Sequence, residues 1–363
     1  MTSIPKWVDV VIVPIVSLLL AAAISALVML AIGENPWTAL KLMITGALGS
    51  SYGWGYTLYY TTNFIFTGLA VAIAFHARIF NIGGEGQAAL GGLGLTLFVL
   101  NVSLPHWSLY LLVGMLGSAL FGAAWAYVPA ILQAKRGSHV VITTIMFNFI
   151  AAAVLNMLLV GALKPQGAME PSSAKFAPTA HLPTLHEILA PLGIAFSKSG
   201  PANISLFVAL IAALAVWYLI WRTRLGYEMR AFGHSEAAAL YAGISPTKII
   251  VVTMLISGGL AGMMALNTTM GEAERLLQDF TEGAGFIGIA VALMGRSHPI
   301  GVVLAALLFG FLYQGGAELA MWTSVPREMI LVIQALVILF TGALDNMVRM
   351  PIIALLGRLR KEA

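Results

Sequence analysis

The chain has 363 residues, of which 60% are hydrophobic and 9% are charged. Because a soluble domain normally carries about 25% charged residues, this composition excludes a water-soluble protein. The formal net charge of +4 comes from basic residues grouped in short segments, which does not indicate nucleic-acid binding, and the absence of cysteine excludes disulfides and thiolate metal ligands.

Long apolar stretches dominate the sequence. A helix that spans a bilayer needs about 20 mostly apolar residues, and these stretches lack the alternating pattern of barrel strands. The sequence therefore predicts an all-α fold, a polytopic membrane helical bundle of about ten transmembrane helices, some discontinuous, in one transmembrane domain over residues 1–363. The stretches lie near 8–32, 57–77, 85–103, 106–134, 138–162, 202–221, 246–269, 283–296, 298–316 and 327–348.

The segment from Phe80 to Gln87 reads FNIGGEGQ and interrupts the apolar sequence after the second stretch. Irregular backbone at membrane depth survives only where protein or a water-filled cavity satisfies its polar groups, and an acid there indicates a functional site. The alternative is a tight cytoplasmic turn, in which Glu85 serves the first turn of the following helix. The residues leave both interpretations open.

Amide and acidic side chains within the spans are candidates for a polar pathway, because a polar solute needs hydrogen-bond donors and acceptors. Asn148 lies about ten residues into its stretch, hence ~15 Å deep by helix rise, with Phe147 and Phe149 beside it. For any one amide, a hydrogen bond between helices is the simpler explanation. The candidates are Asn63, Asn81, Glu85, Gln87, Asn148 and Gln314, with Asn156 and Gln334 as further amides in the spans.

The segment 226–248 contains a short helix between two apolar stretches. Ser235 is a good N-cap, and Glu236 places negative charge in the first turn. Strong helix formers follow, and Gly243 after the last turn can adopt a positive φ. Because a helix of about two turns is marginal in water, it must dock against something. It is either an ordinary interfacial connector or a coupling helix that contacts a cytoplasmic ATPase.

The basic residues predict the topology through the positive-inside rule. Two predicted helices lie between the first and second basic clusters and four between the second and the last, so all three clusters lie on the same side of the membrane. Both termini are therefore predicted to be cytoplasmic. Residues 163–201 then form one long extracytoplasmic loop, and the acidic stretch 270–283 is also external. The cytoplasmic clusters are Lys135 and Arg136; Arg222, Arg224, Arg230 and Lys248; and Arg349, Arg358, Arg360 and Lys361.

Two apolar segments resemble each other. Gly68 to Ile73 reads GLAVAI and Gly288 to Leu293 reads GIAVAL, and a basic residue and a glycine follow each of them. Related halves are common in transporters, but short matches of Ala, Gly and Val also arise easily in membrane sequences. An internal repeat and a chance match both remain open.

Two further stretches carry a resemblance to a known family. The run RAFGHSEAAALYAGIS from Arg230 to Ser245, followed by SGGLAG, resembles the coupling region of ABC importer permeases. FNIGGEGQ and the run GIAVALMGRSHPIG from Gly288 to Gly301 resemble sequences of the nucleoside branch, which is related to ribose and branched-chain amino acid permeases. The resemblance covers roughly residues 30–348. It implies that Arg230, Gly233, Ser235, Glu236, Ala237, Tyr241 and Gly243 couple to the ATPase.

The resemblance implies a transporter subunit rather than an enzyme. The expected function is ATP-driven import of nucleosides or related ribose-containing solutes across a bacterial cytoplasmic (inner) membrane, with no cofactor bound by this chain. The expected partners are a cytoplasmic ABC ATPase, an extracytoplasmic solute-binding protein and a second permease subunit, identical or not. The chain itself has no G-x-x-x-x-G-K-[ST] phosphate-binding loop.

Other functions remain as alternatives. A simple-sugar ABC permease would share all these features. An ion-coupled secondary transporter would need intramembrane acids as a relay, for which Glu85 and Glu318 are the candidates. An intramembrane enzyme would need a nucleophile and a base, and no such constellation is visible. The seven histidines are scattered without metal-ligand spacing, so no metal site is expected.

Overall fold

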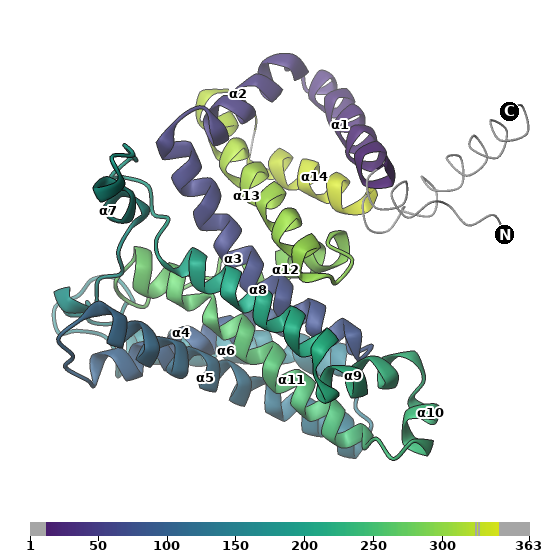
Figure 1. Ribbon diagram of the computed structural model, residues 1–363. Coiled ribbons are helices and arrows are strands. Elements are labelled where there is room, and N and C mark those ends of the chain that lie inside the picture. The colour runs from purple at the N-terminus through teal and green to yellow at the C-terminus, as the bar shows by residue number, and fades with distance from the viewer. Residues whose placement is uncertain (1–11, 324, 326, 341–363) are drawn as a thin grey trace, which may run out of the picture. The chain divides into compact units, whose positions relative to one another are not determined.

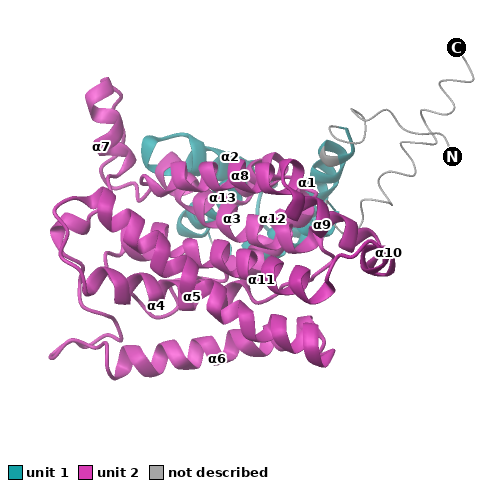
Figure 2. Ribbon diagram, turned by 60° about the horizontal axis from the view of Figure 1, so that its bottom comes forward, with its two compact units in different colours: residues 1–53, 311–363 teal, residues 54–310 magenta. Residues whose placement is uncertain are grey.

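The computed structural model describes residues 12–323, 325 and 327–340, and helices make up the regular structure of these residues (Figure 1). Strand-like pairing within them is limited to two isolated bridges, Ser172 with Leu277 and Thr184 with Asn203. The predicted all-α fold is therefore confirmed. The chain divides into two compact units, residues 1–53 with 311–363 and residues 54–310 (Figure 2).

Within the described residues, six helices are long and apolar enough to cross a membrane, or seven if one bent helix pair counts as a span. The chain is thus a multi-pass membrane protein, but the predicted number of about ten is not confirmed. Several predicted spans are shorter helices, and the ends of the first and last stretches lie outside the described residues. The six helices cover Ser51–His76, Trp107–Arg136, Val140–Val160, Ser205–Arg222, Pro246–Glu272 and Pro299–Trp322.

The smaller unit contains α1 (Val13–Ala31), α2 (Pro36–Leu48), the end of α13 (Pro299–Trp322) and α14 (Arg327–Ile338). The chain bends by 118° between α1 and α2. The bend has a local cause, because the Asn35 side chain accepts a hydrogen bond from the Trp37 amide and Pro36 begins the new helix. The sequence prediction of one span near 8–32 missed this second helix.

Three helices form the centre of the larger unit: α4 (Gly84–Leu100), α5 (Trp107–Arg136) and α11 (Pro246–Met263), which Figures 1 and 2 show side by side. Their glycines bring the backbones together. A Cβ atom on Gly117 would lie 2.8 Å from the Gly94 carbonyl oxygen, and one on Gly258 would meet the backbone of Gly122. The small residues of these helices therefore serve close helix packing.

The remaining helices of the larger unit are α3 (Ser51–His76), α6 (Val140–Val160), α8 (Ser205–Arg222), α9 (Arg224–His234), α10 (Glu236–Tyr241) and α12 (Ala284–Met294). A 7-residue π-helix, η4 (Leu266–Glu272), continues α11. The α6 helix packs on α4 and α5 with one face and is exposed on the other.

The two stretches that were predicted to be external contact each other. The Ser173 amide donates to the Leu276 carbonyl at 2.9 Å, and the Phe176 amide donates to the Glu274 carbonyl at 2.8 Å. The long loop also holds η2 (Pro178–Ala180), α7 (Leu185–Leu189) and η3 (Ala190–Leu192). This contact places both stretches at the same end of the helices, and their external location stays a prediction.

The two segments that resemble each other end in the same way. The helix containing Gly68 closes with Arg78 at φ 54°, and the helix containing Gly288 closes with Arg296 at φ 51°. In each, a backbone amide reaches five residues back, from Ile79 to Ala74 at 3.0 Å and from Ser297 to Ala292 at 2.8 Å. Equivalent helix ends of this kind are compatible with an internal repeat.

Candidate functional site

The broken helix near residue 80 brings two helix N-termini together at Glu85. The α3 helix ends at His76, residues 77–83 are not helical, and α4 begins at Gly84. The Glu85 carboxylate accepts hydrogen bonds from the Thr281 hydroxyl at 2.5 Å and from the Gly283 and Gly285 amides at 3.0 and 2.8 Å. It therefore lies in the first turn of α4 and also caps α12, where both helix dipoles favour its negative charge.

The interrupted segment is held by a buried pair of amides. Asn81 and Gln87 exchange two hydrogen bonds, at 2.9 and 3.1 Å, and each side chain belongs to a residue that is 1% exposed. Asn81 also donates to the Ser257 hydroxyl on α11 at 2.9 Å and accepts from the Gly83 amide at 2.9 Å. These two candidates anchor the irregular backbone to α11.

Asn148 on α6 performs a similar structural task. Its carbonyl oxygen accepts from the Gly86 amide at 2.9 Å, and its amide nitrogen donates to the Ile82 carbonyl at 2.9 Å. Both ends of the side chain are thus committed to the backbone at the start of α4. A hydrogen bond between helices explains this residue, and the same holds for Asn63, which accepts from Asn267 at 2.8 Å.

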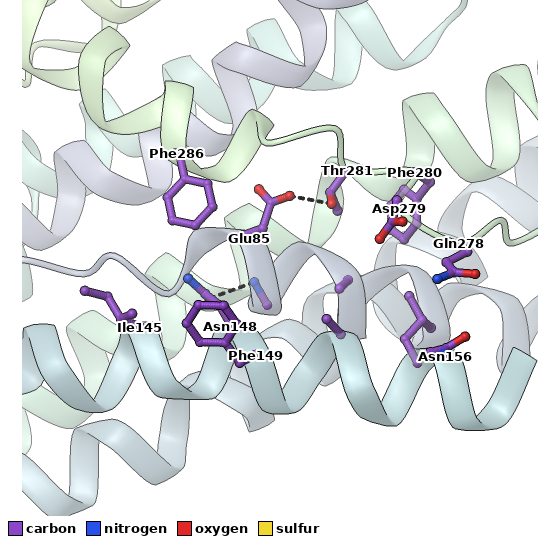
Figure 3. Close-up of a pocket in the computed structure, with 14 residues that line it drawn as sticks. Glu85, Ile145, Asn148, Phe149, Asn156, Gln278, Asp279, Phe280, Thr281 and Phe286 are labelled. Atoms are coloured by element: carbon purple, nitrogen blue, oxygen red, sulfur yellow. Dashed lines mark hydrogen bonds between the residues drawn. The ribbon is translucent and has the colours of Figure 1, made fainter.

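A cavity of about 210 Å³ opens beside Glu85 (Figure 3). Its walls come from the start of α4, from α6, from the segment 278–281 and from α12. The lining residues are Glu85, Gly86, Ala89, Ile145, Asn148, Phe149, Ala152, Leu155, Asn156, Gln278, Asp279, Phe280, Thr281 and Phe286.

One part of the cavity is mainly aromatic, and the other contains three polar side chains. Figure 3 shows Phe286 on α12 and Phe149 on α6 near Glu85, whereas Asn156, Gln278 and Asp279 lie at the other end together with Phe280. Among the described residues, the side chains of these three polar residues hydrogen-bond to no other protein group. They are therefore available to a ligand, unlike Asn148.

The segment 226–248 forms the capped helix that the sequence predicts. The Ser235 hydroxyl accepts from the Ala238 amide at 3.3 Å, α10 runs from Glu236 to Tyr241, and Gly243 has φ 78°. The helix buries Ala239 and exposes Tyr241, whose exposed fraction is 97%. Leu240 is exposed as well, so α10 presents two large apolar side chains at its surface.

Comparison with known proteins decides the family. Residues 53–342 match the family described as branched-chain amino acid transport system / permease component. The chain belongs to this permease family. It is 34% identical to the glucose ABC transporter permease protein TsgB13 of Haloferax volcanii over 93% of this chain and 88% of the relative.

Two further relatives of this permease come from bacteria. The guanosine ABC transporter permease protein NupP of Bacillus subtilis is 33% identical over 93% of this chain and 94% of the relative. The nucleoside ABC transporter permease protein NupB of Lactococcus lactis subsp. cremoris is 32% identical over 91% of this chain and 90% of the relative. Each of these two bacteria holds a further permease relative that is 28% identical to this chain.

The structure separates the predicted site residues of the permease into three groups. Glu85 and Asn148 line the cavity, together with Asn156. Asn81 and Gln87 form the anchor beside the cavity. Asn63 and Gln314 do not line it. Gln314 donates to Glu318 on its own helix at 3.3 Å. Of the predicted coupling residues, Ser235, Glu236, Ala237, Tyr241 and Gly243 are exposed, Arg230 is half-buried and Gly233 is buried.

Sequence reasoning about the permease missed Gln278, Asp279, Phe280 and Phe286 as cavity residues. The acidic character of 270–283 pointed to this stretch only as an external loop. A backbone feature marks it in the structure, since Glu274, Asp279 and Glu282 have φ of 51°, 54° and 46°. Left-handed backbone at non-glycine residues concentrates at functional sites.

Proposed function

We propose that this permease is the membrane-spanning subunit of an ATP-driven importer for nucleosides or related ribose-containing solutes. The observation that carries the proposal is the cavity beside Glu85, which combines aromatic rings with unpaired polar side chains. The guanosine and nucleoside permeases among the relatives support it, as each aligns with more than nine-tenths of this chain.

The chemistry of a nucleoside matches both parts of the cavity. A purine or pyrimidine base can pack on the rings of Phe149 and Phe286, where aromatic contacts contribute about 0.5–1.5 kcal/mol beyond the area they bury. Ribose hydroxyls can donate to the Asp279 carboxylate and exchange hydrogen bonds with Asn156. A buried hydroxyl that finds no partner costs about 1–3 kcal/mol, so these polar groups would select for a ribose.

The cavity is small for such a solute. Pockets that enclose ligands usually measure about 300–1,000 Å³, whereas this one measures about 210 Å³ and includes Phe149, which is 67% exposed. We propose that a second permease subunit completes the site across the exposed face of α6. The further permease relatives in the two bacteria support a paired assembly.

ATP hydrolysis would occur on a separate cytoplasmic ATPase that contacts α10. Tyr241 and Leu240 are exposed on this helix, and Glu236 adds a charge at its start. An extracytoplasmic binding protein would deliver the solute to the end formed by 163–201 and 270–283. We propose that both chain termini lie in the cytoplasm and that the permease belongs to the bacterial cytoplasmic membrane.

A simple sugar is the second candidate solute, because a glucose permease is among the relatives at 34% identity. The two proposals differ in the role of the aromatic part of the cavity. Phe149→Ala with Phe286→Ala should weaken guanosine transport strongly if a base packs there, and should affect a simple sugar much less. Transport of glucose but not of guanosine by the unmodified complex would reject the nucleoside proposal.

The deciding experiment is affinity purification of this chain from native membranes, followed by reconstitution of the complex into proteoliposomes. We expect an ATPase with a phosphate-binding loop to co-purify and radiolabelled guanosine uptake to require internal ATP. Uptake that proceeds without any ATPase and collapses with an ionophore would establish an ion-coupled secondary transporter instead.

A further inference from the structure

The coupling segment touches the broken helix at one glycine. Gly233 lies in the last turn of α9, directly before α10, and is buried. A Cβ atom at this position would collide with the His76 carbonyl oxygen and would lie 3.3 Å from the Ala77 Cα atom. The backbones of α9 and of the α3 C-terminus are therefore in direct contact, with no side chain between them.

His76 extends this contact to a second helix. Its Nε2 atom donates to the Ser297 carbonyl oxygen at 3.0 Å, just beyond the C-terminus of α12. The ring of Trp221 on α8 packs against His76 and His298, with centroid distances of 5.2 and 5.0 Å. The C-terminal ends of α3 and α12 are thus held together beside Gly233.

Both of these segments lead to Glu85. The chain after His76 continues through residues 77–83 into α4, where Glu85 lies in the first turn. The α12 helix has 11 residues, about 16 Å by helix rise, and its other end is capped by the same Glu85 carboxylate. Residues 77–83 and α12 therefore each have one end beside Gly233, and their other ends meet at Glu85 next to the cavity.

There is space for movement next to this contact. A second cavity, of about 700 Å³, is lined by residues 77–80, by the loop between α5 and α6 and by the α9–α10 segment, including Gly233 and Glu236. Coupling between distant sites is carried by packed elements that can adopt two arrangements. An open volume on one side of the Gly233 contact permits α9 to shift against residues 77–80.

We propose that the backbone contact between Gly233 and His76, together with the His76–Ser297 hydrogen bond, transmits movement of α10 to the Glu85 carboxylate. A displacement of α9 pushes on the joined ends of α3 and α12 and changes how Glu85 holds the N-terminus of α12. Gly233 and His76 are positioning residues that contact neither solute nor ATPase. The inference rests on the proposed function, in which an ATPase acts on α10.

The test uses the complete complex in proteoliposomes and measures guanosine uptake and ATP hydrolysis together. Gly233→Ala should lower the number of guanosine molecules imported per ATP at least tenfold, while basal ATP hydrolysis stays within about twofold of the unmodified complex. His76→Leu should have the same effect. His76→Gln should restore most of the ratio, because its side-chain amide can still donate to the Ser297 carbonyl.

Two glycines of the same unit serve as controls. A Cβ atom on Gly259 would make only an ordinary contact of 3.4 Å with Ala119, so Gly259→Ala should change nothing. Gly117→Ala forces a backbone clash at a position outside the proposed connection from Gly233 to Glu85. It should therefore lower the yield of folded complex but leave the ratio of imported guanosine to hydrolysed ATP unchanged. It thereby separates loss of packing from loss of coupling.

The outcomes are distinguishable. An unchanged ratio in both Gly233→Ala and His76→Leu would overturn the inference while leaving the proposed function intact. If Gly233→Ala fails to assemble, the difference between His76→Leu and His76→Gln decides, and equal ratios in these two variants would also overturn it. An unmodified complex that shows no ATP-dependent uptake would instead contradict the proposed function.

Discussion

At the scale of single residues, the cavity is organised by one carboxylate. Glu85 accepts three hydrogen bonds, two of them from backbone amides at the start of α12. Such amides have no partner within their own helix, so the side chain supplies both the missing acceptors and a compensating charge. A neutral side chain of the same shape would lose the charge and part of the accepting capacity.

We therefore expect Glu85→Gln to lower guanosine uptake more than tenfold and to destabilise the permease by about 1–2 kcal/mol. The measurements are uptake in proteoliposomes and thermal unfolding in detergent. Glu170→Gln is the matched control, because the Glu170 side chain is 74% exposed and pairs only loosely with Arg275 at 3.5 Å. Normal uptake by the Glu85 variant would show that its carboxylate is dispensable.

Asp279 gives a prediction about solute selection. Asp279→Asn keeps the shape of the side chain but replaces an acceptor oxygen with a donor, so it should no longer accept from two ribose hydroxyls. We expect the KM for guanosine to rise about tenfold, equivalent to roughly 1.4 kcal/mol. The comparison solute is 2′,3′-dideoxyguanosine, for which the change should be much smaller. An equal effect on both compounds would remove Asp279 from ribose recognition.

At the scale of elements, α10 depends on caps at both ends. Ser235 begins it, Gly243 ends it, and Ser245 caps the following helix by accepting from the Lys248 amide at 3.4 Å. These local interactions explain how a helix of 6 residues keeps its place between α9 and α11. Its exposed residues are then free to contact another protein.

Glu236→Arg reverses the charge at the start of α10 and opposes the helix dipole. We expect ATP-dependent uptake to be abolished and the ATPase to be lost from the purified complex, while the chain remains folded in the membrane. Glu170→Arg makes the same change of charge in the loop 163–201, which is predicted to be external, and should leave the ATPase bound. Retention of both uptake and ATPase by the Glu236 variant would argue against α10 as the coupling element.

A histidine joins the loop 163–201 to the acidic stretch 270–283. His181 lies 2.7 Å from Glu274 and 3.3 Å from Glu187. Burial lowers the pKa of His181, but hydrogen bonds to the Glu274 and Glu187 carboxylates outweigh it and raise this pKa above its usual value. For Glu187, burial raises the pKa, whereas hydrogen bonds from Thr184 and His181 lower it overall.

The signs of these shifts define a pH window. A raised histidine pKa stabilises the folded loop at acidic pH, and this contribution is lost as the pH rises through the folded-state pKa. Because the pKa of Glu187 is lowered in the folded loop, its ionised carboxylate stabilises the loop at pH values above the usual carboxyl pKa. This stabilisation is lost as the pH falls through the folded-state pKa. Hydrogen exchange of residues 163–201 should therefore be slowest near about pH 5–6 and should speed up, after correction for intrinsic rates, above about pH 7. His181→Gln should remove this dependence, and its persistence would assign it to other groups.

At the scale of the whole molecule, function requires that the two ends of the helices face different compartments. Residues 163–201 and 270–283 contact each other at one end, and α10 lies with the basic residues Arg224 and Lys248 at the other (Figure 1). A binding protein and an ATPase could then act on the same chain from opposite sides of the membrane.

The absence of cysteine makes this topology directly measurable. A membrane-impermeant maleimide should label Ser199→Cys in intact cells, because this position is exposed in the loop 163–201, which is predicted to be external. It should label Ala242→Cys, which is exposed after α10, only once the cells are opened. Labelling of both variants in intact cells would contradict the orientation.

The sequence by itself determined the features that depend on local interactions. Apolar length identified a membrane protein, because lipid demands apolar side chains and hydrogen-bonded backbone whatever the fold. The caps of α10 and the break after α3 were also predictable, since each involves residues only a few positions apart. The number of spans was not, because the short apolar stretches 85–103 and 283–296 were counted as spans, whereas the structure gives α4 only 17 and α12 only 11 helical residues.

Only the tertiary structure decided which polar residues line the cavity. Glu85 meets the Gly285 amide across 200 positions of the sequence, and an amide such as Asn148 looks the same whether it binds backbone or faces a cavity. The same applies to Gly233, whose importance comes from the carbonyl oxygen of His76 that it allows to approach. Such contacts depend on how helices pack, and packing is a property of surfaces brought together from distant segments.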